Sequence, residues 1–256
     1  MAYQIIYNTI TKNHPMAERL YREIGEKIKQ EIAKSDINIG DKLPTERVYA
    51  ELFGVSRTLV REAFIMLEIE ELIEVRKGSG SYLKNNLSSQ TVDKVSDVGP
   101  FELLQARQVL ESTIAAQAAL SITKADIQQL QETLDLEGAE LSSVEKSNKA
   151  DRDFHLLIAK ATQNTLLLDT VTRIWDMRDG NPMWQKLHAR INDSSYHGQW
   201  IEDHKQVLLQ LRKRNAEGAR KAMWQHLENV KQTLFTLSDT DDPEFDGYIF
   251  AHPKDK

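Results

Sequence analysis

The sequence predicts a mainly α-helical protein that combines an N-terminal winged helix-turn-helix with a C-terminal all-α helical bundle. Three observations predict this class. Apolar residues recur at helical spacing through residues 16–84 and end in one short pair of strand-like segments. A polar stretch follows, and beyond it the helical spacing continues without strand-like alternation. We therefore expect an arm at 1–15, the winged helix-turn-helix at 16–84, a linker at 85–99, the helical bundle at 100–238 and an irregular tail at 239–256.

The first helix and the two capped helices after it follow from apolar spacing and from residues that start or stop helices. A stripe with a spacing of four residues predicts an amphipathic helix over 16–34. The stripe consists of Leu20, Ile24, Ile28 and Ile32. Thr45 is placed to cap a second, short helix that Gly54 ends, and Ser56 is placed to cap a third.

The apolar faces of the second and third helices predict which residues pack in the core. For the second helix they are Val48, Ala50, Leu52 and Phe53, and for the third they are Val60, Ala63, Phe64 and Leu67. Two short strands then flank a turn at 77–80, where glycines allow positive φ angles. This hairpin is the expected wing.

Beyond Pro100 the periodicity predicts helices alone. Their expected bounds are about 101–120, 124–142, 147–162, 165–178, 184–191, 197–213 and 216–236.

Composition excludes several kinds of site. The chain has 256 residues, of which 40% are hydrophobic and 28% charged, and it contains no cysteine. Disulfides, thiolate metal sites and cysteine nucleophiles are therefore excluded. No signal-like segment is present, and no apolar run approaches the ~20 residues of a membrane helix, so we expect a cytoplasmic protein without a membrane partner. The net charge of −6 lies mainly in residues 87–256, so nucleic-acid binding requires a local basic cluster.

The start of the third helix offers such a cluster. In a helix-turn-helix the second helix of the motif lies in the major groove, with its N-terminal residues near base edges. Arg57 and Arg61 share a face there, and an arginine that bonds guanine bidentately contributes about 1–3 kcal/mol of discrimination. Ser56 and Thr58 suit contacts with phosphate or bases. The alternative is that both arginines pair with neighbouring acids, such as Glu62, on a solvated surface.

The wing strengthens the first interpretation. Arg76 and Lys77 stand beside Gly78, a shape that allows a close approach to a minor groove. The cap, the turn, the arginine spacing and the basic wing together favour operator double-stranded DNA as a partner.

Four side chains of the helical bundle have the chemistry of metal ligands. Asp151 and His155 are four residues apart and share a helix face, while His204 and His226 each fall on an apolar stripe. One carboxylate and three imidazoles suit Zn²⁺, Ni²⁺ or Mn²⁺. The alternative is that the histidines are hydrogen-bonded core residues and that the Asp–His pair is a local contact. The residues alone support both interpretations about equally.

An arginine on an apolar stripe indicates a second possible site, a pocket for an anionic ligand. Arg107 must be paired if it is buried, either by Glu111 one turn on or by an anionic ligand, and both remain open. Arg178, Trp184 and His188 also lie where they could line such a pocket.

The N-terminal part resembles a known family. The segments G-D-K-L-P-T-E-R, V-S-R-T-L-V-R-E-A and G-S-G resemble the DNA-binding domain of the GntR family of bacterial regulators over residues 17–84. In that family the arginine of L-P-x-E-R and those of the recognition helix contact the operator. The resemblance thus implies DNA contacts by Arg47, Arg57 and Arg61, with Ser56 and Thr58 beside them and Lys77 and Gly78 at the wing tip.

The C-terminal part resembles the all-helical effector domain of the FadR branch, often called the FCD domain. The resemblance covers residues 100–236 through F-E-L-L-Q-A-R-Q-V-L-E-S, D-R-D-F-H-L-L-I-A-K-A-T-Q-N, D-H-K-Q-V-L and A-M-W-Q-H-L. Many members bind a metal through one Asp and three His, and the effector carboxylate approaches that metal. The ligand set implied here is Asp151, His155, His204 and His226. The motif also places Asn164 near the pocket, although an Asn there could simply cap the next helix.

The phrases GPFELLQARQ, NPMWQKLH and AMWQHLENVK more narrowly resemble the hexuronate-utilisation repressors. That resemblance implies galacturonate, glucuronate, tagaturonate or fructuronate as the effector. We therefore expect a DNA-binding transcriptional repressor that is not an enzyme, acts as a homodimer and responds to a sugar acid at a metal-containing pocket. The rivals are a regulator for another small carboxylate, a sensor of the metal itself, and a metal-dependent enzyme, for which no general base beyond Asp151 is evident.

Overall fold

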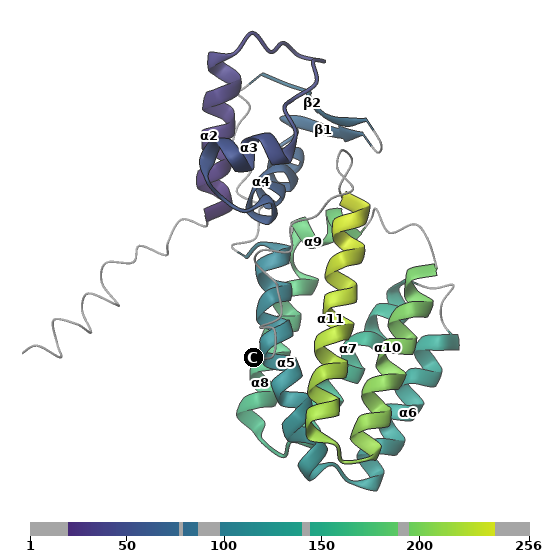
Figure 1. The fold of residues 1–256 in the computed structure, drawn as a ribbon. Helices are drawn as coiled ribbons and strands as arrows, with labels where there is room; N and C mark the ends of the chain where they lie inside the picture. The colour runs from purple at the N-terminus through teal and green to yellow at the C-terminus, as the bar shows by residue number, and fades with distance from the viewer. Residues whose placement is uncertain (1–19, 77–78, 87–97, 140–143, 189–194, 239–256) are drawn as a thin grey trace, which may run out of the picture. The chain divides into compact units, whose positions relative to one another are not determined.

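The computed structural model describes residues 20–76, 79–86, 98–139, 144–188 and 195–238 (Figure 1). The expected arm at 1–15, most of the expected linker and the tail from 239 lie outside the described residues. The chain divides into two compact units, with the division between Gly99 and Pro100.

The N-terminal unit is a winged helix-turn-helix. Its elements are α2 (Leu20–Lys34), α3 (Glu46–Phe53), α4 (Arg57–Ile69), β1 (Ile73–Arg76) and β2 (Gly80–Leu83). Helices α2 and α3 pack against α4, and β1 pairs antiparallel with β2 (Figure 1). The register runs from Ile73 opposite Leu83 to Arg76 opposite Gly80, so the hairpin closes at the wing tip. Residues 77 and 78 of that tip lie outside the described part.

The turn between α3 and α4 is built as the capping residues predict. The Thr45 hydroxyl accepts a hydrogen bond from the Val48 amide, and the Ser56 hydroxyl accepts one from the Leu59 amide at 3.2 Å. Gly54 ends α3 with φ at 64°, a left-handed conformation that costs other residues strain. These local contacts fix where α4, the second helix of the motif, begins.

The core of this unit confirms one predicted face and corrects another. The apolar face of α4 is buried as expected, at Val60, Ala63, Phe64 and Leu67. On α3, however, Val48 and Leu52 are exposed, at 42% and 58%, and Tyr49 is buried instead. The reason is aromatic packing, because the Tyr49 ring lies 5.8 Å from both Phe53 and Phe64 between ring centroids. In α3 the packing of Tyr49 therefore decides which face is buried.

The C-terminal unit is all-α throughout its described residues, which confirms the predicted fold class. Its helices are α5 (Pro100–Ser121), α6 (Lys124–Ala139), α7 (Val144–Ala161), α8 (Thr165–Asp179), α9 (Pro182–His188), α10 (Ser195–Arg212) and α11 (Ala216–Ser238). Helix α5 packs against α7, α8, α10 and α11, while α6 packs against α7 and α10. Parallel and antiparallel neighbours thus enclose one shared interior (Figure 1).

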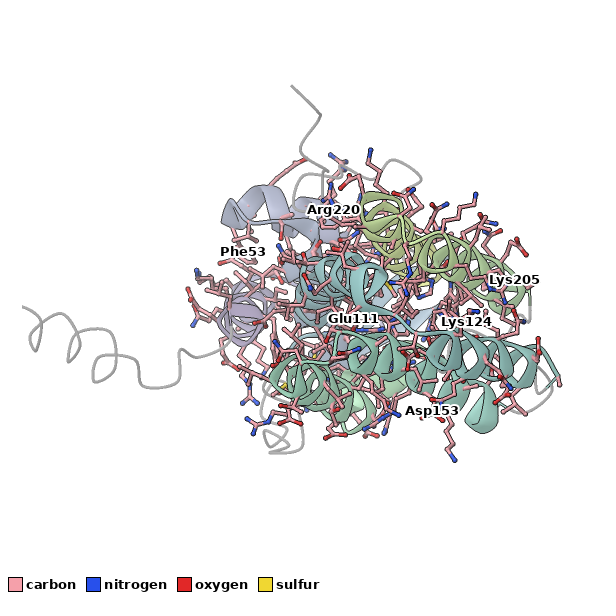
Figure 2. The ribbon with its side chains drawn as sticks, turned by 90° about the horizontal axis from the view of Figure 1, so that it is seen from below. Phe53, Glu111, Lys124, Asp153, Lys205 and Arg220 are labelled. Atoms are coloured by element: carbon pink, nitrogen blue, oxygen red, sulfur yellow. The ribbon has the colours of Figure 1, made fainter. Side chains whose placement is uncertain are left out.

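That interior is apolar at one end and polar in the middle. The rings of Phe101 and Phe235 stack with centroids 4.3 Å apart, which joins the start of α5 to the end of α11. Farther along α5, Glu111 is only 2% exposed, whereas Asp153 and Lys205 point away from the bundle (Figure 2). A buried carboxylate requires polar partners, so a functional site is expected in the polar middle of the bundle. None of the described helices is long and apolar enough to cross a membrane.

Candidate metal centre and nucleic-acid interface

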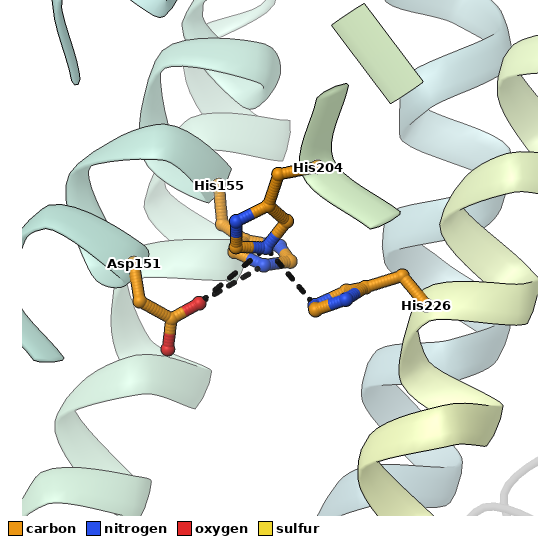
Figure 3. Close-up of side chains that lie close together, drawn as sticks. All are labelled: Asp151, His155, His204 and His226. Atoms are coloured by element: carbon orange, nitrogen blue, oxygen red, sulfur yellow. Dashed lines mark hydrogen bonds and ion pairs between the residues drawn. The ribbon is translucent and has the colours of Figure 1, made fainter. Parts of the chain in front are cut away.

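Four candidate ligands converge in the polar middle of the bundle (Figure 3). Helix α7 contributes Asp151 and His155 from successive turns, α10 contributes His204 and α11 contributes His226. One ligand atom from each residue lies within 4.8 Å of all the others. The three imidazoles are buried, and the side chain of Asp151 is 22% exposed. The structure therefore brings together the whole predicted set.

The converging atoms are a carboxylate oxygen and imidazole Nε2 atoms. Asp151 Oδ1 lies 3.4 Å from His155 Nε2 and 3.6 Å from His204 Nε2. His204 Nε2 lies 3.1 Å from His226 Nε2. All three rings thus turn the same nitrogen toward one region.

The opposite nitrogen of each ring faces a carboxylate. The pairs are His155 Nδ1 with Glu111, His204 Nδ1 with Glu137 Oε2 at 3.0 Å, and His226 Nδ1 with Asp203 Oδ2 at 3.8 Å. A carboxylate behind Nδ1 favours the tautomer with the proton on Nδ1, which leaves the Nε2 electron pair directed at the centre. Electron pairs that face one another without a proton between them repel, and a cation relieves that repulsion. The residues present therefore fit a divalent metal ion.

Neighbouring charges hold two carboxylates of the site ionised. Burial raises the pKa of Asp151, but His155 and Arg178 outweigh burial and hold that pKa well below its ordinary value. Burial also opposes ionisation of Glu111, yet Arg107 and His155 lower its pKa to about 2. Both carboxylates are consequently anionic at neutral pH.

The histidines respond to the same surroundings in opposite directions. Burial, followed by repulsion from His204, lowers the pKa of His226 to about 3, so this imidazole is neutral. Burial also disfavours the charged form of His155, but Glu111 and Asp151 outweigh it and raise the pKa of that ring. Protons therefore compete with a cation for His155 more strongly than for His226.

A cavity that opens to solvent adjoins the converging ligands, and its unfilled space amounts to about 330 Å³ with the open solvent included. Its lining includes Arg107, Asp151, Arg178, His226, Trp184 and Trp200. The guanidinium carbons of Arg107 and Arg178 lie 4.1 Å and 4.3 Å from the centre of the Trp175 ring. Two cations that stack on one indole beside a group of ligands suit the binding of an anion.

The predicted effector residues divide between this cavity and the surface. Arg107 lines the cavity and is also paired with Glu111, so both roles considered for it are present. Arg178 lines the cavity and approaches Asp151 Oδ2 at 3.4 Å. The structure does not bring Asn164 there, because its exposed side chain caps α8 and accepts hydrogen bonds from two backbone amides. The side chain of His188 lies outside the described part.

In the N-terminal unit, three of the predicted DNA-contacting residues stand at the start of α4. Ser56, Arg57 and Thr58 stand at its first turn, and Arg47 lies on α3, where it pairs with Glu51 at 3.0 Å. Lys77 and Gly78, predicted for the wing tip, are outside the described residues.

The structure places neither of the two α4 arginines on the solvated surface that the alternative assumed. Arg57 is 7% exposed and Arg61 is 1% exposed, rather than both lying on a solvated face. The Arg61 guanidinium donates to the Glu46 carboxylate through Nε at 2.8 Å and Nη2 at 2.5 Å. Sequence spacing placed Arg61 on one face with Arg57 but gave no indication of a partner on the preceding helix. In this structure Arg61 joins α4 to the start of α3.

Comparison with known proteins gives the family. Residues 20–83 match the family described as bacterial regulatory proteins, gntR family, and residues 102–229 match the FCD domain. The Uxu operon regulator of Haemophilus influenzae is 52% identical over 237 residues, which cover 92% of this chain and 89% of that protein. This chain belongs to the GntR family. It is a DNA-binding transcriptional regulator with an FCD domain, and its relatives are regulators rather than enzymes.

Two further relatives of this GntR regulator extend over nearly its whole length. The Uxu operon transcriptional regulator of Escherichia coli is 49% identical over 253 residues, which cover 96% of this chain and 98% of that protein. The Exu regulon transcriptional regulator of Escherichia coli is 44% identical over 240 residues, with coverages of 91% and 92%.

Sequence reasoning missed the residues that support the site of the GntR regulator. Glu137 lies on another helix, 67 positions from His204, and no local pattern connects the two. Asp203 is adjacent to His204 in sequence yet faces His226. Of these residues, only Glu111 could be linked to a partner from the sequence, because it stands one turn after Arg107 on the same face of α5.

Proposed function

We propose that this GntR regulator controls hexuronate-utilisation genes, as a repressor whose operator binding responds to a sugar acid in the cavity of the helical unit. The observation that carries this proposal is the set of four converging ligands beside two cavity-lining arginines. The names of the relatives, Uxu operon regulator and Exu regulon regulator, supply the class of target genes. The same proposal assigns DNA reading to 16–84, effector binding to 100–238 and the connection to 85–99.

A divalent metal, Zn²⁺, Ni²⁺ or Mn²⁺, would be held by Asp151, His155, His204 and His226. Formal charge supports this assignment. Among the described side chains of the centre and its direct contacts, the carboxylates are those of Asp151, Glu111, Glu137 and Asp203, and the guanidiniums are those of Arg107 and Arg178. The carboxylates exceed the guanidiniums by two charges, which a divalent cation balances. Once bound, such a cation supplies a positive centre that a carboxylate oxygen can ligate.

The arginines suit the remaining chemistry of a sugar acid. A guanidinium matches a carboxylate bidentately and also donates to hydroxyls, and both Arg107 and Arg178 present such donors to the cavity. The indoles of Trp184 and Trp200 give the cavity flat apolar surfaces against which a sugar ring can lie. Galacturonate, glucuronate, tagaturonate and fructuronate all combine one carboxylate with several hydroxyls.

For DNA binding we propose that the start of α4 lies in the major groove, with Arg57 toward base edges and Ser56 and Thr58 toward the backbone. Arg47, Lys77 and Gly78 complete the proposed contacts. Arg61 is proposed to act by holding Glu46 and the angle between α3 and α4, and thereby to place Arg57. Two copies in a homodimer would read the two halves of a nearly palindromic operator.

The test uses the full-length protein and an operator duplex obtained by selection from randomised DNA. Operator affinity is measured by fluorescence anisotropy with each of the four hexuronates, once with Zn²⁺ and once with EDTA. We expect at least one hexuronate to change the affinity tenfold or more with metal and to have no such effect with EDTA.

Three other outcomes would replace the proposal. A response only to lactate or gluconate would move the effector to another class of carboxylate. A response to Zn²⁺ without any sugar acid would make the protein a metal sensor. Conversion of the hexuronate into a product would support the interpretation as an enzyme.

A further inference from the structure

We propose that Glu111 is a positioning residue that joins the metal ligand His155 to the effector arginine Arg107, so that metal binding and sugar-acid binding depend on one carboxylate. The inference rests on the proposed function, because it takes the four-ligand centre to bind metal and the adjoining cavity to bind an anion.

The geometry gives each oxygen of Glu111 a different partner. Arg107 Nε donates to Oε1 at 2.7 Å, and Oε2 contacts His155 Nδ1. Arg107 Nη2 reaches Oε2 at 3.5 Å, so its bond to that oxygen is the weaker one. All three residues are 2% exposed, which leaves little room for water to replace either contact.

Each partner of Glu111 also faces one of the two proposed binding sites. His155 turns Nε2 toward Asp151, while the Arg107 guanidinium lies over Trp175 and lines the cavity. An imidazole that shares its Nε2 electron pair with a cation donates its Nδ1 proton more strongly. Glu111 then gives more of its charge to His155 and less to Arg107, which leaves the guanidinium better able to bind an anion. Metal and sugar acid should therefore favour each other's binding.

Only a carboxylate can serve both partners at once. Each partner is a donor, and a carboxylate offers an acceptor oxygen to each of them, whereas the amide of glutamine has one oxygen and an NH₂ group. In Glu111→Gln the charged Arg107 claims the amide oxygen, because hydrogen bonds from charged donors are stronger. The NH₂ group then meets His155 Nδ1, forces the proton onto Nε2 and removes the electron pair that a metal requires.

Glu137 provides the matched comparison. It stands behind His204 as Glu111 stands behind His155, at 3.0 Å from Nδ1, but among the described residues it contacts no arginine. In Glu137→Gln the amide oxygen therefore remains available to His204. The two variants make the same chemical change, and only one of them removes a shared acceptor.

The experiment measures Zn²⁺ affinity of chelator-stripped full-length protein by calorimetry, and the melting temperature with each of the four hexuronates. We expect Glu111→Gln to weaken Zn²⁺ binding by about 10–100-fold, whereas Glu137→Gln should lose several-fold at most. The hexuronate-dependent rise in melting temperature should also be lost in Glu111→Gln. The melting temperature in EDTA reports any loss of fold separately.

A rescue variant distinguishes this role from general support of the core. In the double variant Glu111→Gln/Arg107→Gln no guanidinium competes for the amide oxygen, so it can accept from His155, and Zn²⁺ affinity should recover at least tenfold. The double variant also removes a buried arginine that has lost its carboxylate partner, which protects against the misfolding of the single variant.

The remaining outcomes would contradict either the inference or the proposed function. Equal Zn²⁺ affinities in Glu111→Gln and Glu137→Gln, or no recovery in the double variant, would overturn the inference. Weak Zn²⁺ binding with an intact hexuronate response would mean that Glu111 supports His155 alone. That result would also overturn the inference. If wild type binds no Zn²⁺ or responds to no hexuronate, the proposed function fails instead, and that result is visible before any variant is compared.

Discussion

Removing His204 should abolish the stabilisation of the helical unit by metal. Its ring is fully buried, with Nδ1 at 3.0 Å from Glu137 and Nε2 at 3.1 Å from His226. A ligand present at a hundredfold excess over its Kd stabilises the folded state by about 2.7 kcal/mol. For a unit of roughly 140 residues, with an unfolding entropy of about 2.1 cal/mol/K per residue, this corresponds to a rise in Tm of roughly 9 °C. In His204→Ala we expect the rise on Zn²⁺ addition to fall below about 2 °C on the same scale.

The same substitution has a cost without metal, which must be measured separately. The buried carboxylate of Glu137 loses its imidazole donor, and an unsatisfied buried polar group costs about 1–3 kcal/mol. The melting temperature in EDTA should therefore also fall. Leu130→Ala is the control, since this buried α6 residue has no polar role and large-to-small core changes cost about 2–5 kcal/mol. It should melt early but keep its response to Zn²⁺.

Differential scanning calorimetry with Zn²⁺ and with EDTA gives both quantities, and elemental analysis gives the metal content. A Zn²⁺-dependent rise in His204→Ala equal to that of wild type, with unchanged metal content, would refute His204 as a ligand.

Three further predictions concern the N-terminal unit. Arg57→Ala should lower affinity for the selected operator at least tenfold while binding to random duplex DNA changes little; equal loss on both duplexes would argue against base reading. Glu46→Gln should leave the Arg61 guanidinium without its carboxylate and lower the free energy of unfolding by about 1–3 kcal/mol in urea titration, and an unchanged midpoint would show that the pair is dispensable. Gly54→Ala should cost about 1–2 kcal/mol in the same assay, because φ at 64° is strained for alanine; a neutral effect would mean that the turn relaxes.

The sequence predicted what depends on near neighbours along the chain. The helices of the second unit begin and end close to their expected bounds, because apolar spacing and caps are local signals. The contact of Asp151 with His155 and that of Arg107 with Glu111 are likewise one turn long. Such pairs are readable because helical geometry alone places them on one face.

Pairs of residues on different helices could not be predicted from spacing along the sequence. Nothing local indicates that Arg61 meets Glu46, 15 positions earlier, or that Glu137 stands behind His204. Whether a side chain is exposed depends on these partners, and the alternative of a solvated surface for Arg61 does not hold for that reason. A set of four ligands could be anticipated from residue type and resemblance, but the acceptors that orient the rings required the fold.

Under the proposed function, a single bound ion would act on most of this bundle at once. The four converging side chains come from α7, α10 and α11, and the carboxylates behind two of the rings come from α5 and α6. A cation at this point would therefore tie five helices together. In the same proposal, the sugar acid would change DNA binding only by the difference in its affinity for two states of the protein. A tenfold change in operator affinity corresponds to about 1.4 kcal/mol, which is less than the about 1.5–3 kcal/mol of one hydrogen bond to a charged group. Under the proposed function, one charged contact that the effector makes in only one of the two states would therefore be large enough for such a change.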